Sequence, residues 1–220
     1  MPTLSIDSSI KLKCPRTALG FLTARVTTYE TAAGLLEEMK LQEKKILKLP
    51  EPRAVLESPR ILATRAGYKA LGKDPARYRG SAEALLRRIL SGKGFPQVNT
   101  VVDIINLVSV ESRLPIGLYD LAHVKGSIVF RAGRAGESYK GIGKYDLNLE
   151  DLAVFCDEVG PHGSPTSDSE RTMVTSATQS IAAILVAFGG PEGLQASCER
   201  MSALLQKYAD GNEIQFKIIS

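Results

Sequence analysis

The chain of 220 residues has no tryptophan, two histidines and three cysteines. Without tryptophan and with few other aromatics, it offers few platforms on which single-stranded bases could stack. Cys14, Cys156 and Cys198 are far apart and form no C-x-x-C pair, which argues against a zinc site or disulfide framework and favours free thiols in a reducing cytosol. With only His123 and His162, a histidine triad or three-histidine metal centre is hard to build. We therefore expect no metal and no cofactor.

Long apolar runs and several familiar motifs are also missing. The first residues, MPTLSIDSSIKLK, lack the apolar core of a signal peptide. The apolar run at 180–188 is shorter than the roughly 20 residues that a membrane helix needs. The sequence contains no G-x-x-x-x-G-K-[ST] loop and no G-x-S-x-G elbow. These absences argue against nucleotide kinases, serine hydrolases and membrane association, and they predict a cytoplasmic protein.

The composition fits a globular domain. Apolar residues make up 44% of the chain and the net charge is +4, which allows a sizeable core and suits contact with a polyanion at one patch. Helical and strand patterns alternate irregularly along the chain, so we expect an α+β (mixed α/β) fold. The predicted organisation is a single compact domain over 1–220, with an N-terminal strand and helix elaboration over 1–50 and a C-terminal β-α-β unit.

Hydrophobic periodicity places the individual elements. The alternating patterns predict strands at 10–13, 18–28, 126–132, 151–158 and 213–220. Amphipathic stripes and cap residues predict helices at 29–48, 53–71, 82–92 and 191–211. The apolar run at 180–188 is compatible with a buried strand or a buried helix, because periodicity does not separate the two.

The densest polar stretch of the chain is GSPTSDSERTMVT, at 163–175. One interpretation is a capped turn, in which Ser167 or Asp168 caps the backbone and Arg171 pairs with a carboxylate. The other interpretation is the wall of a binding pocket. We favour the pocket wall because the stretch follows a predicted strand, and loops held by a rigid scaffold often carry binding and catalytic residues.

A second motif, NTVVDIINLV at 99–108, leads to a known family. Together with Pro115, the tripeptide YDL at 119–121 and Gly136–Glu137, it resembles the B3/B4 editing domain of the bacterial phenylalanyl-tRNA synthetase β subunit. The resemblance covers 65–190 and is strongest to free-standing proteins of this domain type. It implies a mixed α/β domain around a pocket, and an aminoacyl-tRNA deacylase that hydrolyses mischarged tRNA in trans. The alternative is a non-catalytic module that keeps the pocket for an amino acid or RNA.

The resemblance also implies site residues. Hydrolysis of an aminoacyl ester needs a positioned water and donors for the developing oxyanion, but no metal. Asn106 matches an asparagine that lines the family's pocket. The family's histidine falls on Gly117, which we expect to enlarge the pocket, and its glutamate falls near 175–178, where this chain has no carboxylate. The catalytic candidates are Asn106, Asp168, Glu170 and Thr175.

The other candidates would hold the amino acid and the tRNA acceptor end. Arg171 could neutralise the 3′-terminal phosphate, and His162 joins the set although a loop histidine is ordinarily exposed. The candidates for substrate binding are Asn99, Gly117, Tyr119, His162, Ser167, Ser169, Arg171 and Thr172. A basic set, either merely solvated or bound to RNA phosphates, gives the RNA-binding candidates Lys73, Arg77, Arg79, Arg87 and Arg88.

Overall fold

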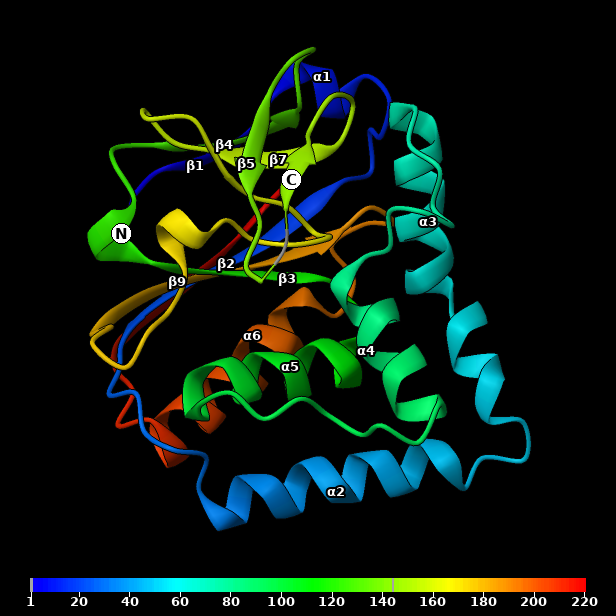
Figure 1. Ribbon diagram of the computed structural model, residues 1–220, viewed down its shortest axis with the longest axis vertical. Coiled ribbons are helices and arrows are strands. Elements are labelled where there is room, and N and C mark those ends of the chain that lie inside the picture. Colours follow the sequence, from blue (N-terminus) through cyan, green and yellow to red (C-terminus); the bar gives the residue numbers. More distant parts are fainter. Residues whose placement is uncertain (1, 144) are drawn as a thin grey trace.

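The computed structural model describes residues 2–143 and 145–220 (Figure 1). Its centre is a four-stranded antiparallel sheet with the strand order β10-β2-β9-β3, which we call the central sheet. Its strands are β2 (Ala18–Arg25), β3 (Ile116–Asp120), β9 (Ser180–Ala187) and β10 (Asn212–Ile219). Because β3 pairs with β9 on one side only, its other side is an outer edge of the sheet.

Helices cover one face of the central sheet (Figure 1). They are α2 (Ala33–Leu47), α4 (Ser81–Leu90), α5 (Thr100–Ser112) and α6 (Leu194–Tyr208). The 3-10 turn η1 (Pro52–Glu57) and helix α3 (Pro59–Leu71) flank this layer. Sequence features set the helix ends: Asn99 accepts from Val102 N at the start of α5, and Gly72, at φ 111°, ends α3.

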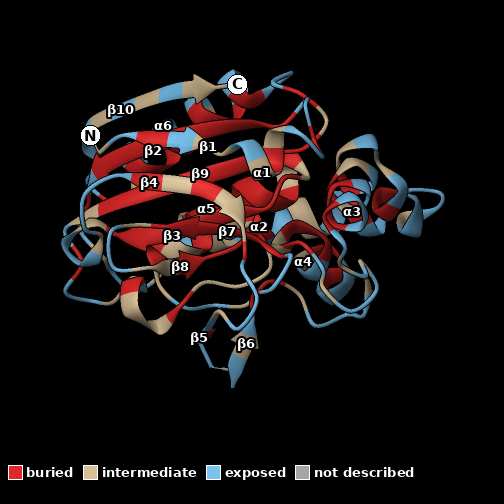
Figure 2. Ribbon diagram, turned by 90° about the horizontal axis from the view of Figure 1, so that it is seen from above, coloured by how far each residue is buried: buried red, intermediate tan, exposed pale blue. Residues whose placement is uncertain are grey.

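A second sheet covers the opposite face. Its strands, in the order β1-β4-β7-β8, are β1 (Leu4–Ile6), β4 (Ile128–Ala132), β7 (Ala153–Cys156) and β8 (Pro161–Gly163). The short elements around it are α1 (Ser8–Lys11), η2 (Leu121–His123), η3 (Glu170–Thr172), and the hairpin of β5 (Ser138–Lys140) and β6 (Asp146–Asn148). In Figure 2 this hairpin projects from the body, while β2, β3 and β9 of the central sheet are almost wholly buried and the edge strand β10 is not.

The two covering layers explain the uninterrupted apolar run of β9. Successive side chains of a strand point to opposite faces, so Leu185 lies in the helix-facing core and Ile184 in the core between the sheets. Both side chains are fully buried. A strand covered on both faces needs apolar residues at every position, and the open choice for 180–188 is thereby decided in favour of a strand.

The expected α+β class is confirmed, and so is the C-terminal β-α-β unit. Strands β9 and β10 are each antiparallel to β2 and therefore parallel to each other, with α6 connecting them. The strand expected at 10–13 is wrong, because Asp7 caps Ser9 N at 2.8 Å and starts α1 there. The helix expected at 53–71 is interrupted before Pro59, where α3 begins after η1. Among the described residues, no helix is both long and apolar enough to cross a membrane.

Candidate functional site

The polar segment, residues 163–172, lies along the outer edge of β3. The backbone N–H of Leu118, which points away from β9, donates to Asp168 Oδ2 at 3.1 Å. The neighbouring outward N–H, of Ile116, donates to Ser81 Oγ at 3.3 Å. Side chains thus take the place of a further strand at this edge, which satisfies its backbone donors and prevents pairing with another chain.

Two other elements hold the polar segment in place. On one side, Ser81 N at the start of α4 donates to Pro165 O at 2.8 Å. On the other side, the β5-β6 hairpin reaches it through Ile142 N, which donates to Asp168 O at 3.0 Å, and through a β-bridge between Gly141 and Ser169. The segment is therefore a fixed wall between α4 and the hairpin rather than a solvated loop.

Three buried tyrosines support the segment from below. Tyr68 Oη lies 2.8 Å from Thr166 Oγ1, Tyr139 donates to Ser167 O at 2.5 Å, and Tyr119 donates to Asp168 Oδ1 at 3.0 Å. Burial raises the pKa of all three phenols, and the negative charge of Asp168 raises the pKa of Tyr119 further. The phenols therefore stay neutral across the physiological range, and Tyr119 and Tyr139 act as hydrogen-bond donors.

The expectation that Gly117 enlarges the pocket is wrong. A Cβ atom at Gly117 would lie 2.7 Å from Tyr119 Cζ, and one at Gly163 would lie 2.6 Å from the same atom. The ring of Tyr119 thus fills the space that both glycines leave between the two sheets. Because Gly117 and Tyr119 are two residues apart on one strand, their side chains share a face.

His162 is fully buried, so the expectation of solvent exposure is wrong. Strand β8 carries it into the core, where its ring meets Tyr119 edge-on with centroids 4.5 Å apart. Burial lowers the pKa of His162 to about 4, so the imidazole is neutral at pH 7. Neither ring nitrogen has a hydrogen-bond partner among the described residues.

Arg171 forms an ion pair with a carboxylate, as the capped-turn interpretation of the polar stretch predicts. Its guanidinium contacts both carboxylate oxygens of Asp157, at 2.9 and 3.0 Å, and donates to His123 O at 3.0 Å. Burial acts to raise the pKa of Asp157, but Arg171 and backbone N–H groups hold it at about 2. These contacts join η2, η3 and the turn after β7. The guanidinium of Arg171 therefore stabilises the fold, and Arg171 is no longer a candidate for phosphate binding.

The remaining candidates have varied surroundings. Asn99 caps α5, and Asn106 lies half-buried on the same helix. Glu170 pairs with Lys140 at 2.9 Å. The hydroxyls of three further candidates have backbone partners: Ser169 accepts from Arg171 N, Thr172 donates to His162 O, and Thr175 accepts from Ala177 N. The structure thus gathers Gly117, Tyr119, His162 and residues 166–168 at one place, while Asn99 and Thr175 serve local turns.

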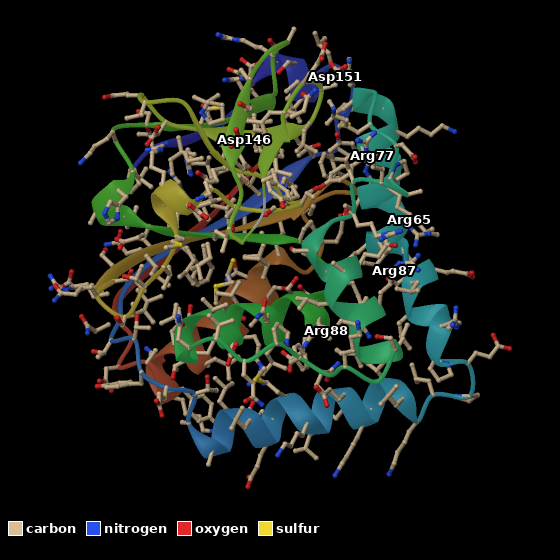
Figure 3. The ribbon with its side chains drawn as sticks, in the orientation of Figure 1. Arg65, Arg77, Arg87, Arg88, Asp146 and Asp151 are labelled. Carbon is tan, nitrogen blue, oxygen red and sulfur yellow. The ribbon has the colours of Figure 1, made fainter. Side chains whose placement is uncertain are left out.

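The basic candidates differ in what they contact. Figure 3 shows labelled arginines along one side of α3 and α4. Arg87 contacts the buried carboxylate of Glu83 at 2.8 Å, together with Arg65, which binds it with two nitrogens. Lys73 and Arg77 instead flank the ring of Tyr78, at 4.6 and 5.7 Å from its centroid.

Sequence reasoning missed one pair of side chains. Asp120 Oδ1 accepts from Ala122 N at 2.9 Å and so caps the turn η2. Its other oxygen, Oδ2, accepts from the Thr178 hydroxyl at 2.7 Å and lies 3.4 Å from His123 Nδ1. The signal was present as the i, i+3 spacing of aspartate and histidine in YDLAH, directly after a strand.

The fold and the site together define the class of this protein: an α+β domain with a polar wall along one edge of its central sheet. The chain belongs to the B3/4 domain family, whose model matches residues 63–210. This membership makes it a module related to the tRNA synthetases.

Curated relatives are phenylalanine–tRNA ligase β subunits. That of Chromobacterium violaceum is 33% identical over 79 residues, 36% of this chain and 10% of the subunit. That of Cutibacterium acnes is 36% identical over 90 residues, 40% of this chain and 11% of the subunit. The matched part thus spans about a tenth of these subunits. An N-terminal fragment of the phenylalanyl-tRNA synthetase β subunit from Pyrococcus horikoshii aligns with 99% of this chain and 50% of its own, at 16% identity and a TM-score of 0.48.

Proposed function

We propose that this protein hydrolyses the ester bond of mischarged aminoacyl-tRNA. The observation that carries the proposal is the polar segment, residues 163–172, fixed against the outer edge of β3 with the half-buried Asp168 at its centre. Membership of the B3/4 family and relatives that are subunits of a tRNA ligase support tRNA as the partner.

The chemistry of the segment suits an aminoacyl ester. Such an ester is already activated, so a positioned water and preorganised donors are sufficient for its hydrolysis. Asp168 offers a carboxylate for the substrate's α-ammonium group, and the hydroxyl of Ser167 and the amide of Asn106 offer neutral hydrogen bonds. Glu170, paired with Lys140 at the rim, is the second acid in reach of the same wall.

The basic residues next to the segment suit the acceptor end of a tRNA. The turn after α3 carries Arg77 and Arg79, and α4 carries Arg88, all exposed. The same two helices contact the polar segment directly, through Tyr68 and Ser81. Phosphates bound by these arginines would therefore bring the 3′ end to the wall, by contacts that depend on charge and shape rather than on base sequence.

The proposal is tested with a panel of tRNAs that carry radiolabelled wrong amino acids. We expect release of at least one amino acid faster than in buffer alone, and a rate lowered about 10-fold or more in Asp168→Asn, since a charge-assisted contact in a desolvated site is lost. Glu199→Gln, an exposed acid on α6, is the matched control. Thermal unfolding of each variant shows that it is folded. Release no faster than in buffer for every tRNA of the panel contradicts the proposal.

A specific observation favours a second candidate, a binding module without catalysis. The Tyr119 ring fills the space at Gly117, and its hydroxyl is bonded to Asp168, which leaves less room for a reacting ester. A thermal-shift screen against free amino acids, with and without tRNA, separates the two functions. A ligand that raises Tm without any ester hydrolysis favours binding alone.

A further inference from the structure

Asp120 is held rigidly at the end of β3. Its side chain is 6% exposed, and its two oxygens accept from Ala122 N and from the Thr178 hydroxyl. His123 Nδ1 lies 3.4 Å from Asp120 Oδ2, and the histidine side chain is 58% exposed. Arg171 anchors the backbone of His123 through its carbonyl. The pair therefore consists of a fixed, buried carboxylate and an accessible imidazole.

A polar cavity lies beside Thr178, the residue whose hydroxyl donates to Asp120. Its volume is about 380 Å³, within the range of small-molecule sites. The lining residues come from the end of β2, the start of β10 and the turn before β9: Arg25, Val26, Thr27, Thr28, Ser176, Ala177, Thr178, Gln179 and Asn212. Arg25 is the one charged residue of the lining, and the described part of the chain supplies no carboxylate partner for it.

We propose that His123 is the general base that activates the hydrolytic water, positioned by Asp120, and that the cavity beside Thr178 receives the nucleotide end of an ester between an amino acid and a nucleoside hydroxyl. This inference rests on the proposed function and assigns the chemistry to residues outside the polar segment.

The contact between Asp120 Oδ2 and His123 Nδ1, at 3.4 Å, suits one tautomer of the imidazole. A carboxylate at Nδ1 favours the tautomer with a proton on that nitrogen. The lone pair is then on Nε2, on the opposite side of the ring, where a water can reach it. Asp120 does not take a proton itself. It orients the ring and stabilises the imidazolium that forms, as in other carboxylate–histidine pairs.

The reaction balances without a further reagent. Nε2 takes a proton from the water as the water oxygen bonds to the ester carbonyl carbon. The tetrahedral intermediate then collapses, the bond between that carbon and the ribose oxygen breaks, and the imidazolium returns the proton to the ribose oxygen. The products are the free amino acid and the tRNA with its terminal hydroxyl restored. In the cavity, Arg25 suits the terminal phosphate, and the hydroxyls and amides suit the ribose.

The composition makes His123 unusually easy to identify by pH. The chain has two histidines, and burial lowers the pKa of the other, His162, to about 4. Burial raises the pKa of all three cysteines. Asp120, Lys125 and Arg171 are charged groups that contact η2, and Asp157 pairs with Arg171. A pH dependence of the activity that His123→Gln removes therefore points to His123.

The experiment measures the pH dependence of deacylation between pH 5 and 8, using the substrate released fastest in the tRNA panel. We expect His123→Gln to lower kcat by about 100-fold or more, with KM changed less than about 2-fold, and to abolish the rise of kcat with pH. Asp120→Asn is expected to lower kcat with the pH profile displaced. Lys125→Gln, an exposed neighbour in the turn after η2, is the control and is expected to match the wild type.

The cavity is tested in the same assay. Arg25→Gln is expected to raise KM about 5- to 10-fold with kcat unchanged, since it removes a phosphate contact, whereas Arg16→Gln, an exposed arginine at a different cavity, is expected to change neither. An active wild type with an unaltered His123→Gln profile overturns the general base and leaves the proposed function standing. An unchanged KM in Arg25→Gln overturns the cavity assignment. A wild type that releases no amino acid overturns both.

Discussion

Tyr119 lies between two glycines, Gly117 on its own strand and Gly163 on the facing sheet. Its ring fills the gap between the sheets, meets the ring of His162, and places its hydroxyl on Asp168. A tyrosine that is both packed on all sides and hydrogen-bonded at its tip is costly to move. The position of Asp168 is therefore set from inside the core rather than by its own loop.

His162 gives a prediction at this scale. The folded state holds its pKa near 4, below the ordinary value of about 6.5, so between these values the unfolded chain binds a proton that the folded chain does not. The free energy of unfolding should therefore fall as the pH falls, by about 1.4 kcal/mol per pH unit and about 3 kcal/mol in all. Urea unfolding at pH 6.5, 5.5 and 4.5 measures this.

His162→Leu is expected to remove most of that slope, because the titrating group is gone. Ser202→Ala, which removes no ionisable group, is the control and should leave the slope in place. Paired carboxylates such as Asp157, with a pKa of about 2, begin to lose their stabilising contribution at about pH 5. The slope between pH 6.5 and 5.5 is therefore the one assigned to His162. An equal slope in wild type and His162→Leu would mean that another group titrates.

The arginines on and next to helices α3 and α4 have different roles: some bind a buried carboxylate and others are exposed. Glu83 is buried on α4 and is bound by two nitrogens of Arg65 from α3 and by Arg87 one turn along α4. Burial acts to raise the pKa of Glu83, but the two guanidinium groups hold it below its ordinary value. This contact joins the helices that support the polar segment, whereas Arg77 and Arg88 remain exposed on the same side.

The RNA-binding surface yields a prediction at the scale of these elements. Arg77→Gln and Arg88→Gln are each expected to weaken tRNA binding and to reduce the slope of log K against log salt by about 1, because each removes one phosphate contact. Arg87→Gln should lower Tm with a smaller change in that slope, since its partner is Glu83. Fluorescence anisotropy with labelled tRNA between 50 and 200 mM KCl measures the slope.

Lys45→Gln, on the exposed face of α2, is the control for net charge. If it changes the slope as much as Arg77→Gln, binding reflects overall charge and not the surface on α3 and α4.

In the whole molecule, the central sheet belongs to two cores at once. Helices pack on one face, and the second sheet packs on the other, so each strand of the sheet contributes alternate residues to both cores. Tyr68, Tyr119 and Tyr139 all lie in the core between the sheets, whereas most of the helices border the helix-facing core. Loss of one core exposes the apolar side chains of the same strands, which couples the two layers.

This coupling predicts a single unfolding transition. Leu185→Ala removes side-chain volume from the helix-facing core and should cost about 2–5 kcal/mol. The buried tyrosines, on the far side of the sheet, should nevertheless lose their near-ultraviolet circular dichroism at the same midpoint as the helices lose their far-ultraviolet signal. Ser202→Ala on α6, a half-buried hydroxyl position, is a mild control. Two separate midpoints in the variant would show that the cores unfold independently.

Much of the fold could be predicted because local patterns decide it. The amphipathic stripe of α6 and the terminating Gly72 of α3 are local signals that the sequence carries without reference to the rest of the fold. Prediction failed where neighbours in space override the pattern. Residues 10–13 alternate like a strand, but Asp7 caps a helical turn there, and the run 180–188 carries no period because both of its faces are buried.

In the candidate site, too, some features follow from the local sequence and others only from tertiary packing. The sequence by itself determined the α+β class, the family motif and the polar character of 163–172, because these depend on residue types and short spacings. Only the tertiary structure decided that Tyr119 fills the space at Gly117, that His162 is buried, that Arg171 pairs with Asp157, and that Asp120 contacts both His123 and Thr178. Those contacts join residues up to 58 positions apart, and packing of two layers on one sheet, not local propensity, brings them together.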